Sequence, residues 1–562
     1  MTSESQKLTR RSFLGLGTAA AGALAVGSLN NYTTTETPIG SNAEFLPDTW
    51  EAETDILVVG CGGAGISAAI TAASENLGEC LVLEAAPKGF EGGNTRVSAQ
   101  VLFIPKSVEG AIEYQTNLNK PYVVESDLMR TWAENICENA TCLPDLDINI
   151  QVTTFMSAEF PELKGSESSA NWLIDGMRLG NESLWLELTR VAEEKGVTIQ
   201  HDTRVTELIF NPITKEVFGV KADVNGATKY YKAKKGVVLA CGGFENNPEM
   251  MDCYYQIGFV ETRPLGTPYN RGDGIKMAQS VGAELWHMNN FAMAGYGICI
   301  GKDNPCTAMA TFAQKDYIFV GADGKRFMYE ETTSLSRHGK MTYGGTSTNF
   351  NSPVPAYVVF GQETFDSRSL TDPSTLSFGW NGVIPDQVAG YNNQDYLDAG
   401  IIVKADTIEE LAQKIGYEPT VLADTVRTYN ENAAQNIDPD FQRGTPIYSH
   451  FDAAAALQGE STETSEERPS IAQFDLVPLE APYYAVRLYI QIINTQGGPK
   501  RSAKGEVVDV FGKPVPRLYA AGELGVIYAY NYNGGGNVSE AIACGRYAAR
   551  QIAGLDSWEA TN

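Results

Sequence analysis

The stretch from Asp55 to Ile70 reads Asp-Ile-Leu-Val-Val-Gly-Cys-Gly-Gly-Ala-Gly-Ile-Ser-Ala-Ala-Ile. Its opening apolar, β-branched run predicts a buried strand. The glycines that follow form the pattern Gly60-x-Gly62-x-x-Gly65, and a second apolar run occupies residues 81–83. The order of strand, glycine-rich turn, helix and strand is typical of a βαβ unit that binds a dinucleotide.

Each glycine of the pattern has a physical role in such a unit. Gly60 permits a tight turn, Gly62 lets the backbone approach a pyrophosphate, and Gly65 lets the helix pack closely on the strand. The helix N-terminus faces the phosphates, because its free N–H groups favour anions. Glu84 ends the second strand 19 residues after Gly65. We therefore expect the Glu84 carboxylate to accept hydrogen bonds from the ribose hydroxyls.

Apolar residues after the glycines recur with the period of a helix. They occupy positions i, i+3, i+4, i+7 and i+11, namely Ile66, Ala69, Ile70, Ala73 and Leu77. This spacing predicts an amphipathic helix with one buried face.

Further segments carry the signals of nucleotide-binding strands and turns. They are Glu91-Gly-Gly-Asn-Thr95, an edge-strand pattern at 203–208, a buried-strand pattern at 236–244, Pro516-Arg-Leu-Tyr-Ala-Ala-Gly-Glu523, and a glycine-rich helix start at 534–541. Together with the βαβ unit they resemble the flavoprotein family of soluble fumarate reductases, urocanate reductases and 3-ketosteroid dehydrogenases. In style the chain is similar to exported steroid and cardiac glycoside reductases of gut actinobacteria. The resemblance covers about residues 50 to 556.

This resemblance implies an α/β fold in which a Rossmann-like FAD-binding domain, made of two discontinuous segments, carries an inserted α+β cap domain. We expect a signal at 1–30, a linker at 31–50, the FAD-binding domain at 51–290 and 472–562, and the cap at 291–471. Within the cap, helical patterns run over 407–415 and 419–434. A cap that closes over the flavin would exclude water and place the substrate at the domain junction.

The resemblance implies FAD as the cofactor, and it places the residues that hold it. These are Gly60, Gly62, Gly63, Ala64, Gly65, Glu84, Gly92, Gly93, Asn94, Thr95, Val205, Gly242, Gly243, Asp273, Glu523, Asn537, Val538 and Ser539. Membrane-bound fumarate reductases attach their flavin to a histidine just after the Gly-Gly-Asn segment. Residues 94–105 contain no histidine, so we predict that FAD is bound noncovalently.

The first 30 residues predict export. Arg10 and Arg11 precede an apolar, Ala-rich stretch that reaches Leu29, in the manner of a twin-arginine signal. The twin-arginine translocase carries folded proteins, so the signal itself implies a cofactor inserted in the cytoplasm. We expect the leader to be cleaved, although an uncleaved anchor is the alternative. The protein is then periplasmic or extracytoplasmic, and associates with the membrane through a partner.

Composition excludes some partners. The chain of 562 residues carries 42 Lys and Arg against 69 Asp and Glu, a net charge of −27, which repels nucleic acid. Its nine cysteines form no C-x-x-C or C-x-x-C-H motif, so a covalent c-type haem on this chain is excluded. We predict no metal site, although scattered cysteines leave an iron–sulfur cluster open. Electrons would then come from a haem cytochrome in trans.

The substrate residues can be compared with the family position by position. In fumarate reductases an Arg binds one carboxylate of the substrate, and the corresponding position in this chain is Asn533. A His binds the other carboxylate, and its position is Asn494. Their proton-donating Arg falls on Ser334, and Arg337 is a nearby replacement. Each charge-assisted hydrogen bond contributes about 1.5–3 kcal/mol. Loss of these cations therefore argues against a dicarboxylate substrate.

Neutral and aromatic residues replace the missing charges. The predicted catalytic residues are Arg337, Tyr532, Tyr343 and His338, and the predicted substrate-binding residues are Tyr528, Tyr530, Asn533, Asn494, Tyr484 and Ser334. Aromatic walls with hydroxyl groups suit a large, mostly apolar substrate that carries a carbonyl. At least half of the tyrosines are expected to pack in the core instead.

We therefore expect an FAD-dependent oxidoreductase that acts on CH–CH groups. It would transfer hydride from the reduced flavin N5 to the activated C=C of a neutral, steroid-like enone during anaerobic respiration, while a Tyr or Arg protonates the neighbouring carbon. One alternative is a 3-ketosteroid dehydrogenase that works in the oxidative direction, and another is a reductase of a small unsaturated carboxylate. The non-enzymatic alternative is a flavin electron carrier.

Overall fold

A parallel sheet organises the computed structural model. The βαβ unit consists of β1 (Ala52–Val59), α2 (Gly63–Ser74) and β2 (Cys80–Leu83). β1 lies between β2 and β9 (Ala227–Leu239) and runs parallel to both. β22 (Pro514–Ala520) continues the sheet by pairing parallel with β9. The predicted α/β class is confirmed, and the sheet joins segments from early and late in the chain, as two discontinuous FAD-binding segments require.

The structure describes residues 42–153, 158–175, 182–255, 257–299, 307–310, 312–331, 340–343, 346–349, 353–371, 379–380, 383, 392–446 and 471–561. The chain divides into two compact units, residues 1–44 and 45–562. Within the described residues, no helix is long and apolar enough to cross a membrane.

The remaining elements complete two large sheets and three small ones. The first sheet also contains β6 (Thr198–Gln200), β7 (Thr203–Phe210), β8 (Val217–Val224) and β21 (Glu506–Val508). The second contains β10 (Thr262–Pro264), β12 (Phe291–Cys299), β13 (Thr307–Met309), β14 (Tyr317–Val320), β17 (Ala356–Phe360), β18 (Ile402–Ala405) and β19 (Tyr483–Thr495). The small sheets are β3 (Leu102–Phe103), β5 (Asn171–Ile174) and β4 (Ile150–Thr153); β11 (Leu285–Trp286) and β20 (Gly498–Pro499); and β15 (Lys340–Tyr343) and β16 (Thr346–Asn349).

Helices fill the connections between these strands. Besides α2, the α-helices in the described residues are α3 (Gly93–Arg96), α4 (Val108–Asn119), α5 (Ser126–Asp145), α6 (Ser183–Glu194), α7 (Pro248–Tyr254), α8 (Asp273–Ser280), α9 (Gln362–Asp366), α10 (Asn393–Asp398), α11 (Ile408–Ile415), α12 (Pro419–Ala433) and α14 (Gly536–Ala553). The 3₁₀ helices are η1 (Asn42–Phe45), η2 (Ser166–Ser168), η3 (Phe259–Glu261) and η8 (Trp558–Thr561).

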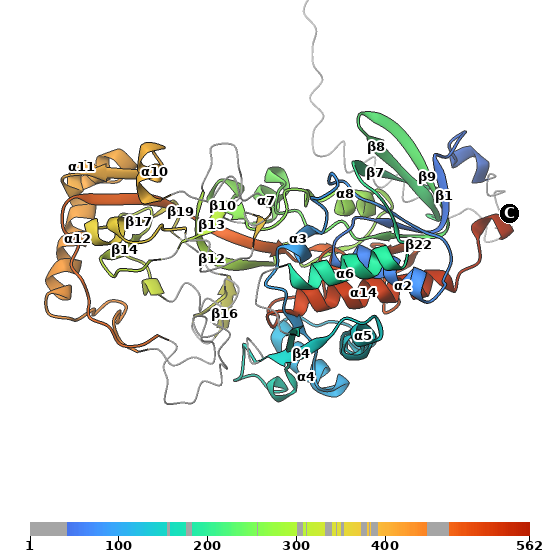
Figure 1. Cartoon of the computed structure of the whole chain (residues 1–562), viewed down its shortest axis with the longest axis horizontal. Coiled ribbons are helices and arrows are strands. Elements are labelled where there is room, and N and C mark those ends of the chain that lie inside the picture. The colour runs from blue at the N-terminus through green and yellow to red at the C-terminus, as the bar shows by residue number, and fades with distance from the viewer. Residues whose placement is uncertain are drawn as a thin grey trace, which may run out of the picture. The chain divides into compact units, whose positions relative to one another are not determined.

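The helix after the glycine turn is more buried than its sequence predicts. The spacing predicts one apolar face, but every residue from Gly63 to Ala72 is buried. The reason is that α2 packs between the sheet and two further helices, α6 and α14 (Figure 1). The α14 contact is close, because a Cβ on Gly545 would lie only 2.0 Å from the backbone oxygen of Ala64. Leu77 lies beyond the end of α2.

The 203–208 pattern forms an edge strand, as predicted. β7 pairs antiparallel with β8, which in turn pairs with β9, so this hairpin extends the parallel sheet. β7 is the outermost described strand of the hairpin and has no second neighbour among the described strands. Its first residue lies beside the carboxyl end of β2, because Thr203 N donates a hydrogen bond to the Glu84 carbonyl at 2.8 Å.

The second sheet is built around the long strand β19. β12, β17 and β18 pair with it antiparallel, and β10 pairs with it parallel. The predicted domain boundaries assign β10 and β19 to the FAD-binding segments and β12, β17 and β18 to the cap. One continuous sheet thus contains strands from both predicted domains. The boundaries themselves stay a prediction.

The two predicted cap helices are confirmed. α11 covers 408–415, and the side chain of Thr407 accepts a hydrogen bond from Glu410 N at the helix start. α12 covers 419–433 and begins with a proline, whose fixed φ suits the first turn. The two helices pack together with β17 and β19 into a separate apolar cluster.

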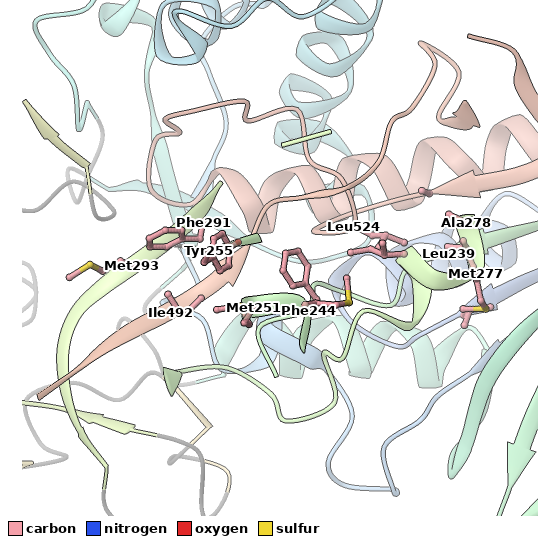
Figure 2. Close-up of a cluster of buried hydrophobic side chains, with 14 of the residues drawn as sticks. Leu239, Phe244, Met251, Tyr255, Met277, Ala278, Phe291, Met293, Ile492 and Leu524 are labelled. Carbon is pink, nitrogen blue, oxygen red and sulfur yellow. The ribbon is translucent and has the colours of Figure 1, made fainter. Parts of the chain in front are cut away.

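An apolar core connects the two large sheets. Leu239 at the end of β9 and Phe244 just after it belong to the same buried cluster as Phe291 of β12 and Ile492 of β19 (Figure 2). Phe244 stacks on Tyr255 with ring centroids 5.8 Å apart, and Tyr255 meets Phe291 edge-to-face at 4.9 Å. This continuous packing fixes the end of the parallel sheet against the second sheet, where the cavity described next lies.

Candidate active site

A cavity of about 350 Å³ opens at the carboxyl ends of the parallel strands. The residues that directly follow β1, β2, β9 and β22 line it, and so do residues of β12, β19 and the start of α14. Ligands of open α/β sheets bind at this edge, because the loops and helix N-termini converge there. The cavity therefore lies where the sequence predicts the cofactor.

The glycine turn has the close packing that its sequence predicts. Gly60 has a φ of +99°, and a Cβ there would lie 2.5 Å from the backbone oxygen of Ala240. A Cβ on Gly65 would lie 1.9 Å from the backbone oxygen of Gly60. A Cβ on Gly62, by contrast, would meet only the Gly92 oxygen, at 3.8 Å. Gly60 and Gly65 thus shape the turn, whereas Gly62 leaves open space on the cavity side.

Glu84 lies at the end of β2 and lines the cavity. Its carboxylate accepts hydrogen bonds from Cys61 N at 2.5 Å and Ala86 N at 2.7 Å. Burial raises the pKa of Glu84, and these backbone donors partly oppose the rise. Each oxygen keeps a further lone pair that can accept a hydrogen bond. The side chain is therefore held in the position that ribose binding requires.

The segment after β2 closes over the glycine turn. Gly62 and Gly92 form a parallel β-bridge, and Gly63 N donates to Thr95 Oγ1 at 3.1 Å. Gly93, Asn94 and Thr95 line the cavity. Two helix starts, those of α2 and α3, thus come together beside it.

Two buried glutamates lie beside the cavity. Asn94 Nδ2 donates to Glu245 Oε1 at 2.9 Å and to Glu523 Oε2 at 3.0 Å. Asn270 Nδ2 donates to Glu245 Oε1 at 2.8 Å and approaches Glu523 Oε2 at 3.5 Å. Thr495 Oγ1 donates to Glu245 Oε2 at 3.2 Å. The two carboxyl groups thus share amide donors, which brings them into one polar cluster.

These two carboxyl groups cannot both carry a charge at low cost. Burial raises the pKa of Glu245 and, together with the negative charge of Glu245, raises the pKa of Glu523 well above the ordinary value. Their hydrogen-bonding partners among the described residues are neutral amides and a hydroxyl. Like charges in a buried site favour the retention of a proton. We infer that the pair carries at least one proton at neutral pH.

The nucleotide end of the cavity holds an ion pair. Val205, the third residue of β7, lines the cavity beside Arg204. Arg204 Nη2 lies 2.6 Å from Asp273 Oδ2 at the start of α8. Both side chains are partly exposed, and ion pairs of this kind contribute little to the stability of a fold. We therefore expect this pair to position the adenosine part of the cofactor.

At the opposite end, β19 meets the start of α14. Asn537 Nδ2 donates to Asn494 Oδ1 at 3.0 Å, and both residues line the cavity. Asn537 Oδ1 is buried and has no hydrogen-bond partner among the described residues. Val538 also lines the cavity, so the N-terminal turn of this 18-residue helix faces it. The helix dipole there stabilises negative charge on a bound group.

Tyr532 is the predicted catalytic tyrosine that reaches the cavity. It lines the cavity with only 5% of its surface exposed. Burial, together with the charges of Glu159 and Glu523, raises the pKa of Tyr532. The phenol therefore stays protonated at neutral pH and can donate a hydrogen bond or a proton.

Asn533 lies behind the cavity wall and does not line it. Its Oδ1 accepts hydrogen bonds from Tyr114 Oη at 3.0 Å and from Glu159 N at 2.9 Å. Glu159 Oε2 in turn accepts from Gly534 N at 2.9 Å. Asn533 thereby fixes the segment that carries Glu159, and Glu159 itself lines the cavity.

Two further predicted tyrosines, Tyr528 and Tyr484, pack in cores, and a third, Tyr530, is only partly buried. Tyr528 is fully buried and meets Trp132 edge-to-face at 6.1 Å, and Tyr530 lies against Tyr122 at 6.1 Å. Tyr484 stacks on Phe365 with centroids 4.2 Å apart and donates to Gln362 Oε1 at 2.8 Å. None of these three tyrosines lines the cavity. The expectation that many tyrosines serve the core holds for Tyr484 and Tyr528.

Most of the predicted cofactor residues converge on the cavity, and four do not line it. Those that line it are Gly60, Gly62, Gly63, Ala64, Glu84, Gly93, Asn94, Thr95, Val205, Gly242, Asp273, Glu523, Asn537 and Val538. Those that lie behind its wall are Gly65, Gly92, Gly243 and Ser539. Ser539 is buried, and its carbonyl accepts a hydrogen bond from Asn139 of α5.

Three predicted residues, Ser334, Arg337 and His338, lie outside the described residues. Tyr343 ends β15, but the structure does not describe its side chain. Their predicted roles therefore stay predictions.

Sequence reasoning missed several residues of the site. Glu245 directly follows the Gly-Gly-Phe segment, and that adjacency was a usable signal. Asn270 and Glu159 lie in irregular segments without a motif. The walls also include Leu265, Met293 and Ile493, which long-range packing brings to the cavity.

The residues present fit FAD. The fixed Glu84 carboxylate matches a ribose, and the first turn of α2 offers backbone N–H groups to a pyrophosphate. The buried Asn537 Oδ1, which has no hydrogen-bond partner among the described residues, provides an acceptor at the other end. Polar groups of this kind are costly to bury unless a ligand pairs them.

Comparison with known proteins agrees with this assignment. The model of the family described as FAD binding domain matches residues 55–538. The chain is 26% identical over 423 residues to the 3-oxosteroid 1-dehydrogenase of Mycobacterium tuberculosis (strain ATCC 25618 / H37Rv), covering 71% of this chain and 70% of the relative. It is 26% identical over 517 residues to a probable fumarate reductase of Shewanella frigidimarina, covering 89% and 75%.

Solved structures show the same fold. The 3-ketosteroid Δ1-dehydrogenase of Sterolibacterium denitrificans superposes with a TM-score of 0.66 at 20% identity, covering 89% of this chain and 99% of that one. An open flavocytochrome c3 fumarate reductase gives a TM-score of 0.60 at 24% identity, covering 90% and 78%. The predicted resemblance and the predicted FAD are thereby confirmed. The chain belongs to the FAD binding domain family, and it is an FAD-dependent oxidoreductase that acts on CH–CH groups.

Proposed function

We propose that this protein reduces the activated C=C of a neutral, largely apolar enone, such as a steroid-like compound. The proposal rests on the charge of the substrate end of the cavity, which is the end where Glu159, Asn494 and Asn537 lie at the start of α14. The charged side chains that line the cavity among the described residues are Glu84, Glu159, Arg204, Asp273 and Glu523. The cation among them, Arg204, is paired with Asp273 at the nucleotide end.

Among the described residues, the substrate end therefore offers acids and amides to a ligand. A dicarboxylate would meet the Glu159 carboxylate there, and Asn494 at the position where fumarate reductases carry a His. Buried like charges repel one another strongly, because the local dielectric constant is low. A neutral carbonyl compound has no such cost, and the apolar residues Val101, Met293 and Ile493 would pack against it.

The chain's own residues supply orientation and a proton. When bound, FAD supplies hydride transfer between its N5 and the carbon β to a carbonyl. Tyr532 faces the cavity as a buried, protonated phenol and can hydrogen-bond a carbonyl or protonate the neighbouring carbon.

Export and electron supply belong to the same proposal. Arg10 and Arg11 support twin-arginine export to an extracytoplasmic site, where a haem cytochrome in trans would supply electrons. A relative named as a probable fumarate reductase is consistent with this direction. Replacing both arginines by lysine should leave FAD-loaded protein in the cytoplasm, and unchanged export would contradict the assignment.

The test uses anaerobic, FAD-loaded protein with reduced viologen as the electron donor. Viologen reoxidation is followed with fumarate, urocanate, a cinnamate and a Δ4-3-ketosteroid as acceptors. We expect turnover with the ketosteroid and none with fumarate. Turnover with fumarate would contradict the charge argument, and silence with every acceptor would favour a flavin electron carrier.

A second candidate is dehydrogenation of a ketosteroid, which the similarity to a 3-oxosteroid 1-dehydrogenase favours. It uses the same cavity in the opposite direction. Oxidation of a saturated 3-ketosteroid with an artificial electron acceptor, at a rate above that of the viologen-driven reduction, would select this direction.

A further inference from the structure

Glu159 brings a negative charge to the substrate end of the cavity from an irregular segment without a motif. It lines the cavity together with Tyr532, Asn494 and Asn537. The hydrogen bond from Gly534 N to Glu159 Oε2 measures 2.9 Å and joins residues 375 positions apart. The carboxylate is thus held directly beside the start of α14.

The position of Glu159 is fixed by a buried network. Asn533, 1% exposed, accepts hydrogen bonds from Glu159 N at 2.9 Å and Tyr114 Oη at 3.0 Å. Tyr114 Oη in turn accepts from Phe160 N at 3.1 Å. Each backbone N–H of residues 159 and 160 therefore has a buried side-chain acceptor. The network positions the Glu159 carboxylate without help from a ligand.

The Glu159 carboxylate also accepts a backbone N–H group that would otherwise be available to an anionic ligand. Gly534 N lies next to the N-cap of α14, Gly535, where backbone N–H groups and the helix dipole favour an anion. Glu159 Oε2 accepts the Gly534 N–H from within the protein. A carboxylate on a substrate would lose this donor and would also face the Glu159 charge.

We propose that Glu159 is a specificity-determining residue that excludes substrates with a carboxylate next to the double bond. The inference rests on the proposed function and deepens it, because it assigns the selection against carboxylates to one side chain. Asn533 contributes indirectly, as a positioning residue that accepts the hydrogen bond from Glu159 N.

Ligand binding to the oxidised, FAD-loaded protein tests this without turnover. Cinnamate and benzalacetone share a styryl group and differ by a carboxylate in place of a methyl ketone. Their dissociation constants are measured from the change that they cause in the flavin absorbance. In Glu159→Gln, which keeps an oxygen for Gly534 N and loses the charge, we expect cinnamate to bind about tenfold more tightly. Benzalacetone should change by less than about twofold.

Two more variants complete the design. Glu162→Gln removes an exposed charge three residues away that does not line the cavity, and it should leave both dissociation constants unchanged. Glu159→Ala removes the acceptor as well, so free acetate should compete with cinnamate in this variant and not in the parent. It serves as the second test should Glu159→Gln fail to retain FAD.

The outcomes separate the two proposals. Tighter cinnamate binding in Glu159→Gln, with benzalacetone unchanged, supports the role of Glu159. Equal changes for both ligands, or no change for cinnamate, would overturn it. If the parent protein binds no benzalacetone while cinnamate still tightens in the variant, the neutral-enone function fails and the role of Glu159 stands.

Discussion

The nucleotide end and the substrate end of the cavity differ in how far apart their residues lie in the chain. At the nucleotide end, the hydrogen bond from Cys61 N to Glu84 spans 23 positions. At the substrate end, the bond from Gly534 N to Glu159 spans 375 positions. The first end is therefore set by a local motif, whereas the second depends on how distant segments pack.

The two ends also differ in charge compensation. Asp273 at the nucleotide end is paired with Arg204, and backbone donors hold Glu84. Glu245 and Glu523 share neutral amide donors. The ion pair and the backbone donors at the nucleotide end hold a fixed cofactor, and we propose that the Glu159 carboxylate at the substrate end selects against further anions. The following predictions test this contrast, from the largest effect to the smallest.

Gly65→Ala should have the largest effect. The added Cβ would lie 1.9 Å from the Gly60 oxygen, so we expect a loss of about 3 kcal/mol in the free energy of unfolding and loss of bound FAD. Thermal melting and the flavin content measure both quantities.

Gly62→Ala is the matched variant, because its Cβ would meet only the Gly92 oxygen, at 3.8 Å. We expect the fold to lose less than about 1 kcal/mol while FAD binds more weakly. Equal destabilisation by the two substitutions would show that the turn does not have the described geometry.

Tyr532→Phe should lower kcat for the neutral enone by about 100-fold while FAD stays bound, because it removes the one buried phenol that the structure places in the cavity wall among the described residues. Since the pKa of Tyr532 is raised, parent activity should not fall at alkaline pH through ionisation of this group. Tyr519→Phe, buried in β22 and outside the cavity wall, is the control. A parent-like kcat in Tyr532→Phe would remove this residue from the mechanism.

Glu245→Gln should change how stability depends on pH. The raised pKa values of Glu245 and Glu523 mean that the folded protein holds a proton which the unfolded chain releases above about pH 4.3. Stability is therefore fully present below that pH and falls as the pH rises toward the raised pKa. In the variant this fall between pH 5 and 8 should be smaller by about 1–2 kcal/mol.

The measurement is the melting temperature of the FAD-loaded protein across this pH range. Glu249→Gln, an exposed residue four positions away, serves as the control and should follow the parent. A variant curve parallel to the parent curve would mean that the two carboxyl groups do not share a proton.

Asp273→Asn should have the smallest effect. Its ion pair with Arg204 is partly exposed, so FAD affinity should fall by less than about fivefold. Titration of the FAD-free protein with FAD gives the affinity. A loss of a hundredfold would show that the nucleotide end depends on this pair after all.

The sequence predicted the nucleotide end well because its signals are local. The strand, the glycine turn and Glu84 lie within one βαβ unit, and hydrophobic pattern and glycine spacing are enough to place them. The edge strand β7 and the cap helices α11 and α12 were found for the same reason. The pattern failed for α2 because burial on several sides comes from α14, which lies far away in the sequence.

The substrate end could be predicted only in part. Asn494, Asn537 and Tyr532, which the sequence assigns to substrate binding, FAD binding and catalysis, all line the cavity, and their roles stay predictions. The resemblance could not distinguish Tyr532 from Tyr484 and Tyr528, which are also tyrosines but pack in cores. No local pattern marks Glu159, because its position depends on Asn533 and Tyr114.

The most direct test of the account is the ratio of kcat/KM for benzalacetone over cinnamate, measured with reduced viologen and FAD-loaded protein. The two compounds share a styryl group and differ by a carboxylate in place of a methyl ketone. Because the ketone also activates the double bond more strongly, the same ratio in Glu159→Gln serves as the reference for the charge preference of the substrate end. We predict a ratio above about 100, because a carboxylate finds no cation among the described residues there. A ratio near one, or below it, would contradict the claim that this end of the cavity selects neutral substrates.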